Sequence, residues 1–350
     1  MRELAQIGGD EAVSWINKGL EDRESYVRVQ ALEALPQTAE KGYAPDVSAV
    51  TACLQDGNCL VRRAAVQALS QIVEKGDTTA FDAVTSLMKK GGSDARTAAV
   101  QALALIVEKG DALAVKAVTD RLEDINWEVR EAALRALSKI VGQADGQVVT
   151  AVTARLEDTK VHVREAAVIA LAQMVEKGDA KAVTAITARL DDREGSYVRL
   201  AAVEALSLIV EQGDAQAVTG ITARLEDTTF YVREAAVIAL SQIAKKGDAK
   251  AVTAITARLD DEEDFSVRLA AMEALSLIVE QGDAQAVTGI SALLEDTVSY
   301  VRLAAVQALS LIAEKGDDQV IAAVSRRLDD DEWDVRAAAS AALTALELHT

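Results

Sequence analysis

Hydrophobic and small side chains recur with a helical period through residues 232–261, which read VREAAVIALSQIAKKGDAKAVTAITARLDD. Counted at 100° per residue, five of them fall on one side of a helix: Val232, Ala236, Ala239, Leu240 and Ile243. A second helical pattern follows the sequence Lys246-Gly247-Asp248. The segment therefore predicts two amphipathic helices joined by a short turn.

This two-helix unit returns along nearly the whole chain, and one arginine column marks its phase. The column contains Arg28, Arg62, Arg96, Arg130, Arg164, Arg199, Arg233, Arg268, Arg302 and Arg336. Its spacing is 34 residues, except for two steps of 35 that end at Arg199 and Arg268. A fixed period of this length with two helices per period predicts an α-solenoid, in which each repeat packs on its neighbours.

The repeats predict one solenoid over residues 1–350, with irregular repeats at 1–48, regular repeats at 49–328 and a partial repeat at 329–350. Pro36 falls within the expected second helix of the first repeat. A proline in a helix interior removes a hydrogen bond and costs about 3 kcal/mol.

A glycine and an aspartate mark the junctions between repeats. The glycines are Gly76, Gly110, Gly178, Gly213, Gly247, Gly282 and Gly316. They suit the left-handed position that ends a helix. Each is followed by an aspartate that we expect to cap the next helix, contributing about 1 kcal/mol: Asp77, Asp111, Asp179, Asp214, Asp248, Asp283 and Asp317.

Composition agrees with an all-helical chain and limits its partners. Half of the residues are hydrophobic, aromatic residues make up 3%, and the formal net charge is −19. Such acidity disfavours binding to nucleic acid or to anionic membranes. It is expected to keep the protein soluble and monomeric, and the alternative reading is attraction to a basic partner.

Targeting and redox features are few. No apolar segment approaches the length of a membrane span, and the start of the chain has no signal-peptide pattern. Cys53 and Cys59 are the only cysteines and form no CxxC motif, so free thiols are expected. We expect an intracellular, cytoplasmic location, with an organellar stroma as the alternative.

An aspartate column accompanies the arginines. Six residues before their arginines stand Asp22, Asp56, Asp124, Asp158, Asp227, Asp296 and Asp330, and seven residues before theirs stand Asp192 and Asp261. This pattern resembles the HEAT-repeat family over essentially the whole chain. The resemblance implies a right-handed superhelix of about ten helix pairs, with an Asp–Arg ladder through the turns inside the repeats. Lys90 occupies the aspartate position of the third repeat, so we expect the ladder to be interrupted at Arg96.

The AAVxAL texture is most similar to the HEAT-like repeats of phycobilisome lyases, and that similarity lies in scaffold positions. Deoxyhypusine hydroxylase also uses such repeats and holds di-iron with His-Glu pairs. This chain has two histidines and no His-Glu pair, which excludes that activity.

The resemblance also implies that the exposed side of each second helix lines a concave groove. With the column arginine as zero, we expect positions −3, −2, +1, +5 and +9 to face a partner. The candidate partner-binding residues are Trp127, Glu165, Ile169, Tyr197, Leu200, Glu204, Leu208, Phe230, Tyr231, Glu234, Ile238, Phe265, Leu269, Glu273, Leu277, Tyr300, Leu303 and Leu311.

Two alternatives stay open for these positions. Curvature could bury the apolar residues between neighbouring helices. The aromatic residues, Trp127 and Trp333 above all, could cover the turns and pack on the preceding repeat.

Catalytic chemistry is not indicated. His162 has no nucleophile near it in sequence, the Glu-Asp pairs lie at helix ends, and the glycines are isolated. We therefore expect no catalytic, metal or cofactor site. The sequence favours a non-enzymatic scaffold or adaptor that binds a protein or peptide. The alternatives are an accessory factor of light-harvesting assembly, similar to a bilin lyase, and an engineered repeat scaffold.

Overall fold

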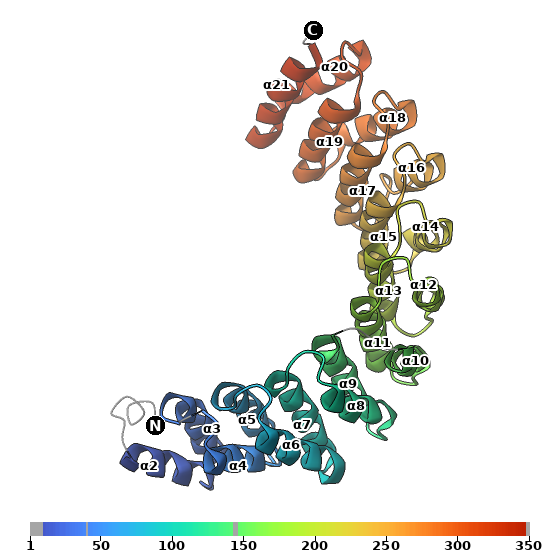
Figure 1. Cartoon of the computed structure of the whole chain (residues 1–350). Helices are drawn as coiled ribbons and strands as arrows, with labels where there is room; N and C mark the ends of the chain where they lie inside the picture. The colour runs from blue at the N-terminus through green and yellow to red at the C-terminus, as the bar shows by residue number, and fades with distance from the viewer. Residues whose placement is uncertain (1–9, 40, 143–145, 348–350) are drawn as a thin grey trace. The chain divides into compact units, whose positions relative to one another are not determined.

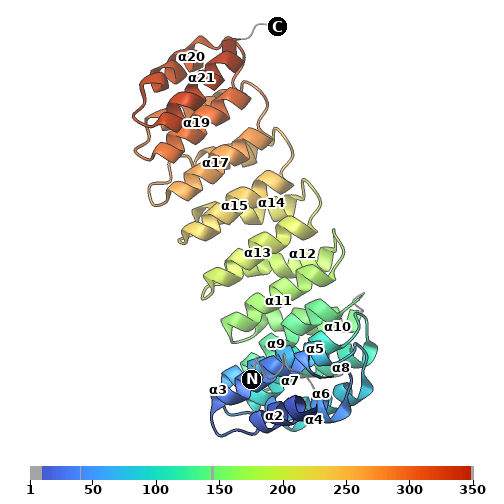
Figure 2. The same cartoon turned by 90° about the vertical axis from the view of Figure 1, so that its left-hand side faces the viewer.

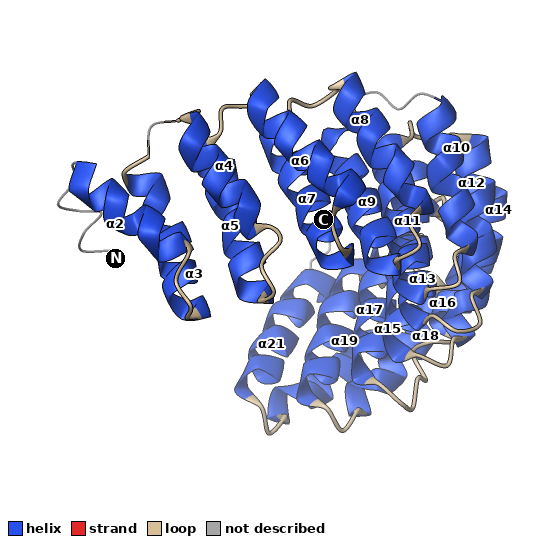
Figure 3. Ribbon diagram, turned by 90° about the horizontal axis from the view of Figure 1, so that it is seen from below, coloured by secondary structure: helices blue, strands red, loops and turns tan. Residues whose placement is uncertain are grey.

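The computed structural model describes residues 10–39, 41–142 and 146–347. Over these residues the chain forms α-helices joined by turns and short 3-10 helices, and it contains no strand (Figure 3). The predicted all-α solenoid of paired helices is confirmed.

Contacts within the chain divide it into two compact units, Met1–Val175 (unit 1) and Glu176–Thr350 (unit 2). In each unit a first helix (A) alternates with a second helix (B), as the labels of Figure 1 show. The extent of the single solenoid and its internal boundaries remain predictions.

Over its described residues, unit 1 contains five helix pairs. Its A helices are α2 (Asp10–Leu20), α4 (Ala44–Cys53), α6 (Thr78–Lys90), α8 (Ala112–Thr119) and α10 (Gly146–Ala154). Its B helices are α3 (Ser25–Ala34), α5 (Cys59–Ile72), α7 (Ser93–Ile106), α9 (Trp127–Ile140) and α11 (Val161–Met174). Its 3-10 helices are η1 (Leu35–Gln37), η2 (Asp120–Glu123) and η3 (Arg155–Glu157).

Unit 2 repeats the arrangement. Its A helices are α12 (Ala180–Thr187), α14 (Ala215–Thr222), α16 (Ala249–Thr256), α18 (Ala284–Ala292) and α20 (Asp318–Ser325). Its B helices are α13 (Ser196–Ile209), α15 (Phe230–Ile243), α17 (Phe265–Ile278), α19 (Ser299–Ile312) and α21 (Trp333–Glu347). Its 3-10 helices are η4 (Ala188–Asp191), η5 (Ala223–Glu226), η6 (Leu293–Glu295) and η7 (Arg326–Asp329).

Consecutive B helices form the main packing layer of each unit. In unit 2, the B helices α13, α15, α17, α19 and α21 lie side by side (Figure 2). They contact one another more extensively than the A helices do. The predicted packed side of α15 is confirmed, because Val232, Ala236, Ala239, Leu240 and Ile243 are at most 2% exposed. Alanine in this layer lets the helices approach closely, and the opposite side of each B helix is left for solvent or a partner.

The junction glycines have the predicted left-handed backbone, with φ between 74° and 90°. They do not end the helix itself, however. Helix α5 ends at Ile72, and Gly76 lies in a turn that is closed by a hydrogen bond from the Asp77 N–H to the Glu74 carbonyl. With φ of 84° at its third residue, Gly76, the turn is of type II, and that position favours glycine. The predicted aspartate caps are confirmed, as at Asp248, which accepts from the N–H groups of Lys250 and Ala251.

The expectation that Pro36 interrupts a helix interior is wrong. Helix α3 ends at Ala34, and Pro36 lies in the first turn of the following 3-10 helix, Leu35–Gln37. A proline there does not remove a helical hydrogen bond, because the first N–H groups of a helix have no partner within it. The first repeat therefore has a shortened B helix in place of a strained one.

An arginine ladder links the repeats. Most column arginines donate to the aspartate carboxylate 28 residues later, in the next repeat, and also to a backbone carbonyl in the turn of their own repeat. The carboxylate pairing is seen for Arg28, Arg96, Arg130, Arg199, Arg233, Arg268 and Arg302. Arg199, for example, lies 2.7 Å from both carboxylate oxygens of Asp227 and 2.9 Å from the Asp192 carbonyl. Each guanidinium thus joins two repeats and fixes the start of a B helix to the next turn.

The predicted break in this ladder is real but was placed one repeat too late. Each ladder arginine pairs with the aspartate position of the next repeat, so Lys90 takes the place of the partner of Arg62. Arg96 has its usual partner, Asp124, at 2.6 Å. Arg62 pairs instead with Asp94 at 2.7 Å, whose side chain is 55% exposed. This ion pair is therefore the most solvent-exposed of the ladder pairs described.

A second arginine column runs in the opposite direction, and the sequence analysis did not predict it. These arginines lie in the 3-10 helices or turns that follow the A helices and donate to a backbone carbonyl of the preceding repeat, as Arg224 in η5 does to Leu190 at 3.0 Å. Arg224 also lies 3.0 Å from the Asp191 carboxylate. Together the two columns fix neighbouring repeats in both directions along the chain.

Candidate partner-binding face

The candidate site is the exposed side of the B helices, which we call the B face: positions −3, −2, +1, +5 and +9 relative to each ladder arginine. Of the predicted residues, Trp127, Glu165 and Ile169 lie in unit 1, and the others lie in unit 2. The two sets are therefore described separately.

The B face of unit 2 exposes large apolar side chains at position +9. Leu208, Leu277 and Leu311 project from α13, α17 and α19 and are 67–68% exposed. Ile238 on α15 lies one turn earlier, at +5, and is 44% exposed. Each of four consecutive B helices thus presents one exposed aliphatic side chain.

The leucines at position +1 behave differently. Leu200, Leu269 and Leu303 are half-buried, so their exposure is smaller than the pattern at 100° per residue indicated. They lie in the first turns of the B helices, next in sequence to the ladder arginines. The alternative of burial between B helices therefore applies in part at +1 and not at +9.

Aromatic side chains line the start of the B helices in unit 2. Tyr197 and Tyr231 stack with ring centroids 5.4 Å apart, and Phe230 meets Tyr231 edge to face at 5.5 Å. Tyr197 is 59% exposed, and Tyr300 on α19 is 67% exposed. These rings are rigid and half-open to solvent, as the anchors of protein interfaces are.

The two tryptophans differ in their surroundings. Trp333 is 64% exposed. Trp127 is half-buried, and its ring stacks on His162 of the following repeat, with centroids 5.4 Å apart. Like the stack of Tyr197 and Tyr231, this contact joins the B helices of two neighbouring repeats.

The B face of unit 2 is acidic as well as apolar. Glu204 and Glu273 are exposed at +5, and Glu234 is half-buried at +1. The cations on α13, α15, α17 and α19 are ladder arginines alone, and all four pair with aspartates of the next repeat: Arg199, Arg233, Arg268 and Arg302. Helices α13, α15 and α17 therefore each present one carboxylate, and none of the four helices presents an unpaired cation.

The ladder carboxylates are held in the charged form. Burial alone raises the pKa of Asp227, but the hydrogen bonds from Arg199 and from the Thr229 N–H outweigh it, and the pKa falls below its ordinary value. For Asp330, the hydrogen bond from Arg302 is the largest cause and lowers the pKa strongly. These carboxylates neutralise the arginines at neutral pH.

The B face of unit 1 has a different, mixed character. Arg135 and Lys139 on α9 and Ile169 and Gln173 on α11 line a cleft of about 240 Å³. Arg135 pairs with Glu131 at 2.9 Å, one turn away on α9. Basic side chains therefore accompany the acidic ones here, in contrast to unit 2.

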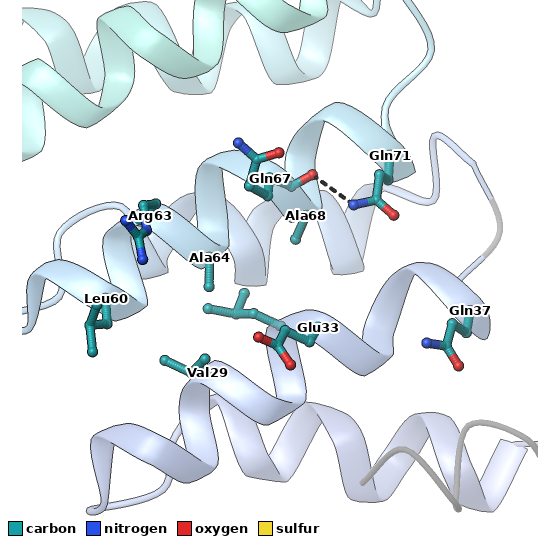
Figure 4. Close-up of a pocket in the computed structure, with 10 residues that line it drawn as sticks. Val29, Glu33, Gln37, Leu60, Arg63, Ala64, Gln67, Ala68 and Gln71 are labelled. Atoms are coloured by element: carbon teal, nitrogen blue, oxygen red, sulfur yellow. Dashed lines mark hydrogen bonds between the residues drawn. The ribbon is translucent and has the colours of Figure 1, made fainter. Parts of the chain in front are cut away.

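A larger cleft of about 620 Å³ lies between α3 and α5 (Figure 4). Val29, Ala64 and Ala68 contribute apolar surface, and Glu33 and Arg63 contribute charges of opposite sign. The sequence analysis named no site residue here. The signal that it could have used is Pro36, because the shortened α3 faces the full length of α5 at this point.

Within the described residues, no group of three or more His, Cys, Asp or Glu side chains could hold a metal ion. His162 is exposed and stacks on Trp127. Cys59 is exposed, whereas Cys53 is buried, and burial raises the pKa of its thiol to about 11. Over the same part of the chain, every helix is too short or too polar to cross a bilayer.

Comparison with known proteins defines the class. The sequence pattern of HEAT repeats matches residues 13–104, 47–138, 115–207, 205–276 and 273–344, so the chain belongs to the HEAT-repeat family. No curated protein sequence matches it.

Solved structures show the same fold at low identity. Importin beta has a TM-score of 0.71 at 16% identity, and the match covers 96% of this chain and 51% of that one. The Escherichia coli protein YibA has a TM-score of 0.56 at 20% identity and covers 75% and 92%. A structure titled as an engineered protein has a TM-score of 0.52 at 21% identity and covers 97% and 99%. At these identities the likeness shows the fold alone.

Proposed function

We propose that the protein is a non-enzymatic scaffold or adaptor that binds a protein or peptide partner on its B face. The proposal is carried by one observation: α13, α17 and α19 expose Leu208, Leu277 and Leu311 at the same register, each 67–68% exposed. Repeated large apolar residues on one exposed face are typical of a surface that a partner covers. Membership of the HEAT-repeat family supports this role, because α-solenoids offer extended surfaces for binding.

The aromatic residues beside these leucines support the same function. Tyr197, Phe230, Phe265 and Tyr300 are 44–67% exposed at the starts of the four B helices. Aromatic side chains supply much of the energy of protein interfaces, because they bury a large area at a small cost in conformational entropy. The face thus combines aromatic residues at one edge with aliphatic residues farther along the helices.

The test is a triple variant, Leu208→Glu, Leu277→Glu and Leu311→Glu, compared with the unchanged protein by affinity capture from a lysate. These side chains are largely exposed, so we expect the fold to persist and the bound proteins to be lost. The +1 leucines are less suitable, because they are half-buried and their substitution would also disturb packing.

A matched control adds the same charge to the A helices of unit 2. It carries three exposed threonines changed to glutamate: Thr184, Thr219 and Thr253. We expect this control to retain the partners that the leucine variant loses. If the leucine variant retains every partner, or if the control loses the same ones, the B face of unit 2 is not the binding surface.

A further inference from the structure

We infer that the B face of unit 2 binds a basic amphipathic α-helix of a protein partner, which lies along the row of B helices and contacts it every seventh residue. The inference rests on the proposed function and specifies the chemistry of the partner.

Charge indicates a cationic partner. The face carries Glu204, Glu234 and Glu273, and the arginines of the same helices are neutralised by ladder aspartates. A partner with acidic residues would meet carboxylates on α13, α15 and α17 and would find no unpaired cation on these helices or on α19. A basic partner gains long-range attraction from the same groups, and the net charge of −19 adds to it.

The spacing of the apolar residues selects a helix over an extended strand. One exposed aliphatic side chain lies on each of four adjacent helices: Leu208, Ile238, Leu277 and Leu311. Packed helices lie about 8–10 Å apart, so this is the spacing that a partner must match. Seven residues of an α-helix rise about 10.5 Å and complete nearly two turns, which returns a side chain to the same face.

An extended segment matches the row less well. At about 3.3 Å per residue, three residues cover one repeat, but successive side chains of a strand alternate in direction. Residues three apart therefore point to opposite sides, and a strand could contact only every second repeat. A helix can contact all four.

The aromatic edge offers sites for the partner's cations. Tyr197 and Tyr231 are stacked, and Phe230 packs edge to face against Tyr231. Tyr197 is 59% exposed, and Phe230 is 44% exposed. A lysine or arginine near the face of an open ring gains a cation–π contact.

The probe is a synthetic helical peptide of 28 residues with leucine at every seventh position, alanine beside it, and lysine and arginine elsewhere. Two matched peptides serve as controls: one has glutamate at every cationic position, and one has leucine at every sixth position. Binding of labelled peptide to the full chain is measured by fluorescence anisotropy at two salt concentrations.

We expect the cationic seven-residue peptide to bind at least tenfold tighter than either control, and to weaken as salt rises. The triple leucine variant should lose this binding, and Glu204→Lys with Glu273→Lys should weaken it at least fivefold. The A-helix threonine control should bind normally. Equal binding of the cationic and anionic peptides, or of the two leucine spacings, would overturn the inference.

The failure of this inference can be distinguished from failure of the proposed function. If the leucine variant loses its captured partners while the cationic peptide binds no better than its controls, the scaffold function stands and the basic helix is wrong. If the leucine variant retains every partner and also binds the peptide normally, both proposals are wrong.

Discussion

Removing one carboxylate charge from the arginine ladder should lower the free energy of unfolding clearly where the ion pair is buried. The same change should have little effect on that free energy where the pair is exposed. Asp261 and Arg233 are a buried pair, with both side chains 5% exposed and contacts of 2.8 and 3.1 Å. Asp94 and Arg62 form the substitute pair, and the Asp94 side chain is 55% exposed. We compare Asp261→Asn with Asp94→Asn, since asparagine keeps the shape of aspartate and removes the charge.

The expected costs differ because solvent screens only one of the pairs. Hydrogen bonds between charged groups contribute about 1.5–3 kcal/mol when buried, and breaking a buried ion pair costs about 3–5 kcal/mol. Arg233 keeps a second contact with Glu263 at 2.9 Å, so we expect about 2–3 kcal/mol for Asp261→Asn. An exposed pair contributes about 0–1 kcal/mol, which is the range that we expect for Asp94→Asn.

Urea titration followed by circular dichroism measures the loss of stability. Because repeats can unfold in parts, hydrogen exchange of α15 and α17 for Asp261→Asn, and of α5 and α7 for Asp94→Asn, localises it. The two variants should differ by at least 1 kcal/mol in the exchange free energy of these segments. Equal losses would refute the reasoning that burial of the ladder determines its contribution.

Gly247→Ala should lower the free energy of unfolding by about 1–2 kcal/mol, and with it the urea midpoint, because φ is +74° at this residue. Gly57→Ala should change the urea midpoint little, since no atom lies near the added Cβ and φ is not positive. Equal midpoints would contradict the requirement for a left-handed residue. Burial raises the pKa of Asp227, but the hydrogen bonds from Arg199 and the Thr229 N–H outweigh burial, so the net pKa is lowered. The ionised carboxylate therefore contributes its full stabilisation of the fold above about pH 4, and this contribution is lost as the pH falls below that value. Urea midpoints at pH 7, 5 and 3 should fall less steeply for Asp227→Asn, and an unchanged profile would contradict this. A thiol reagent should modify Cys59 and spare Cys53 in the native protein, because Cys53 is buried with its pKa raised to about 11. Mass spectrometry of the labelled chain checks this, and rapid labelling of both thiols would contradict it.

The repeat pattern was sufficient to predict each helix pair, because every repeat carries its own helical period and its own turn residues. The buried face of α15 and the positive φ of Gly247 followed from spacing alone. Local signals of this kind lie within a few residues of the structure that they specify. The helix boundaries were less certain, as Pro36 shows by ending α3 early.

Contacts between repeats were harder to predict. The aspartate and arginine columns were visible, but the pairing of each arginine with the next repeat depends on the direction in which the guanidinium crosses the stack. For that reason the effect of Lys90 was assigned to Arg96 when it falls on Arg62. The second column was visible as a recurring Arg-Leu pair, but Arg224 donates to the Leu190 carbonyl, and a backbone acceptor is not encoded in a residue type.

By itself the sequence determined that the chain is a HEAT-type stack of helix pairs, because hydrophobic periodicity and turn chemistry are local and recur every 34 or 35 residues. Only the tertiary structure decided how far each side chain of the B face is exposed. Leu200 and Leu208 lie on the same side of one helix, yet the first is half-buried and the second is 68% exposed. Helical period gives the direction in which a side chain points, but its exposure also depends on how neighbouring helices pack around it, which the period alone does not encode.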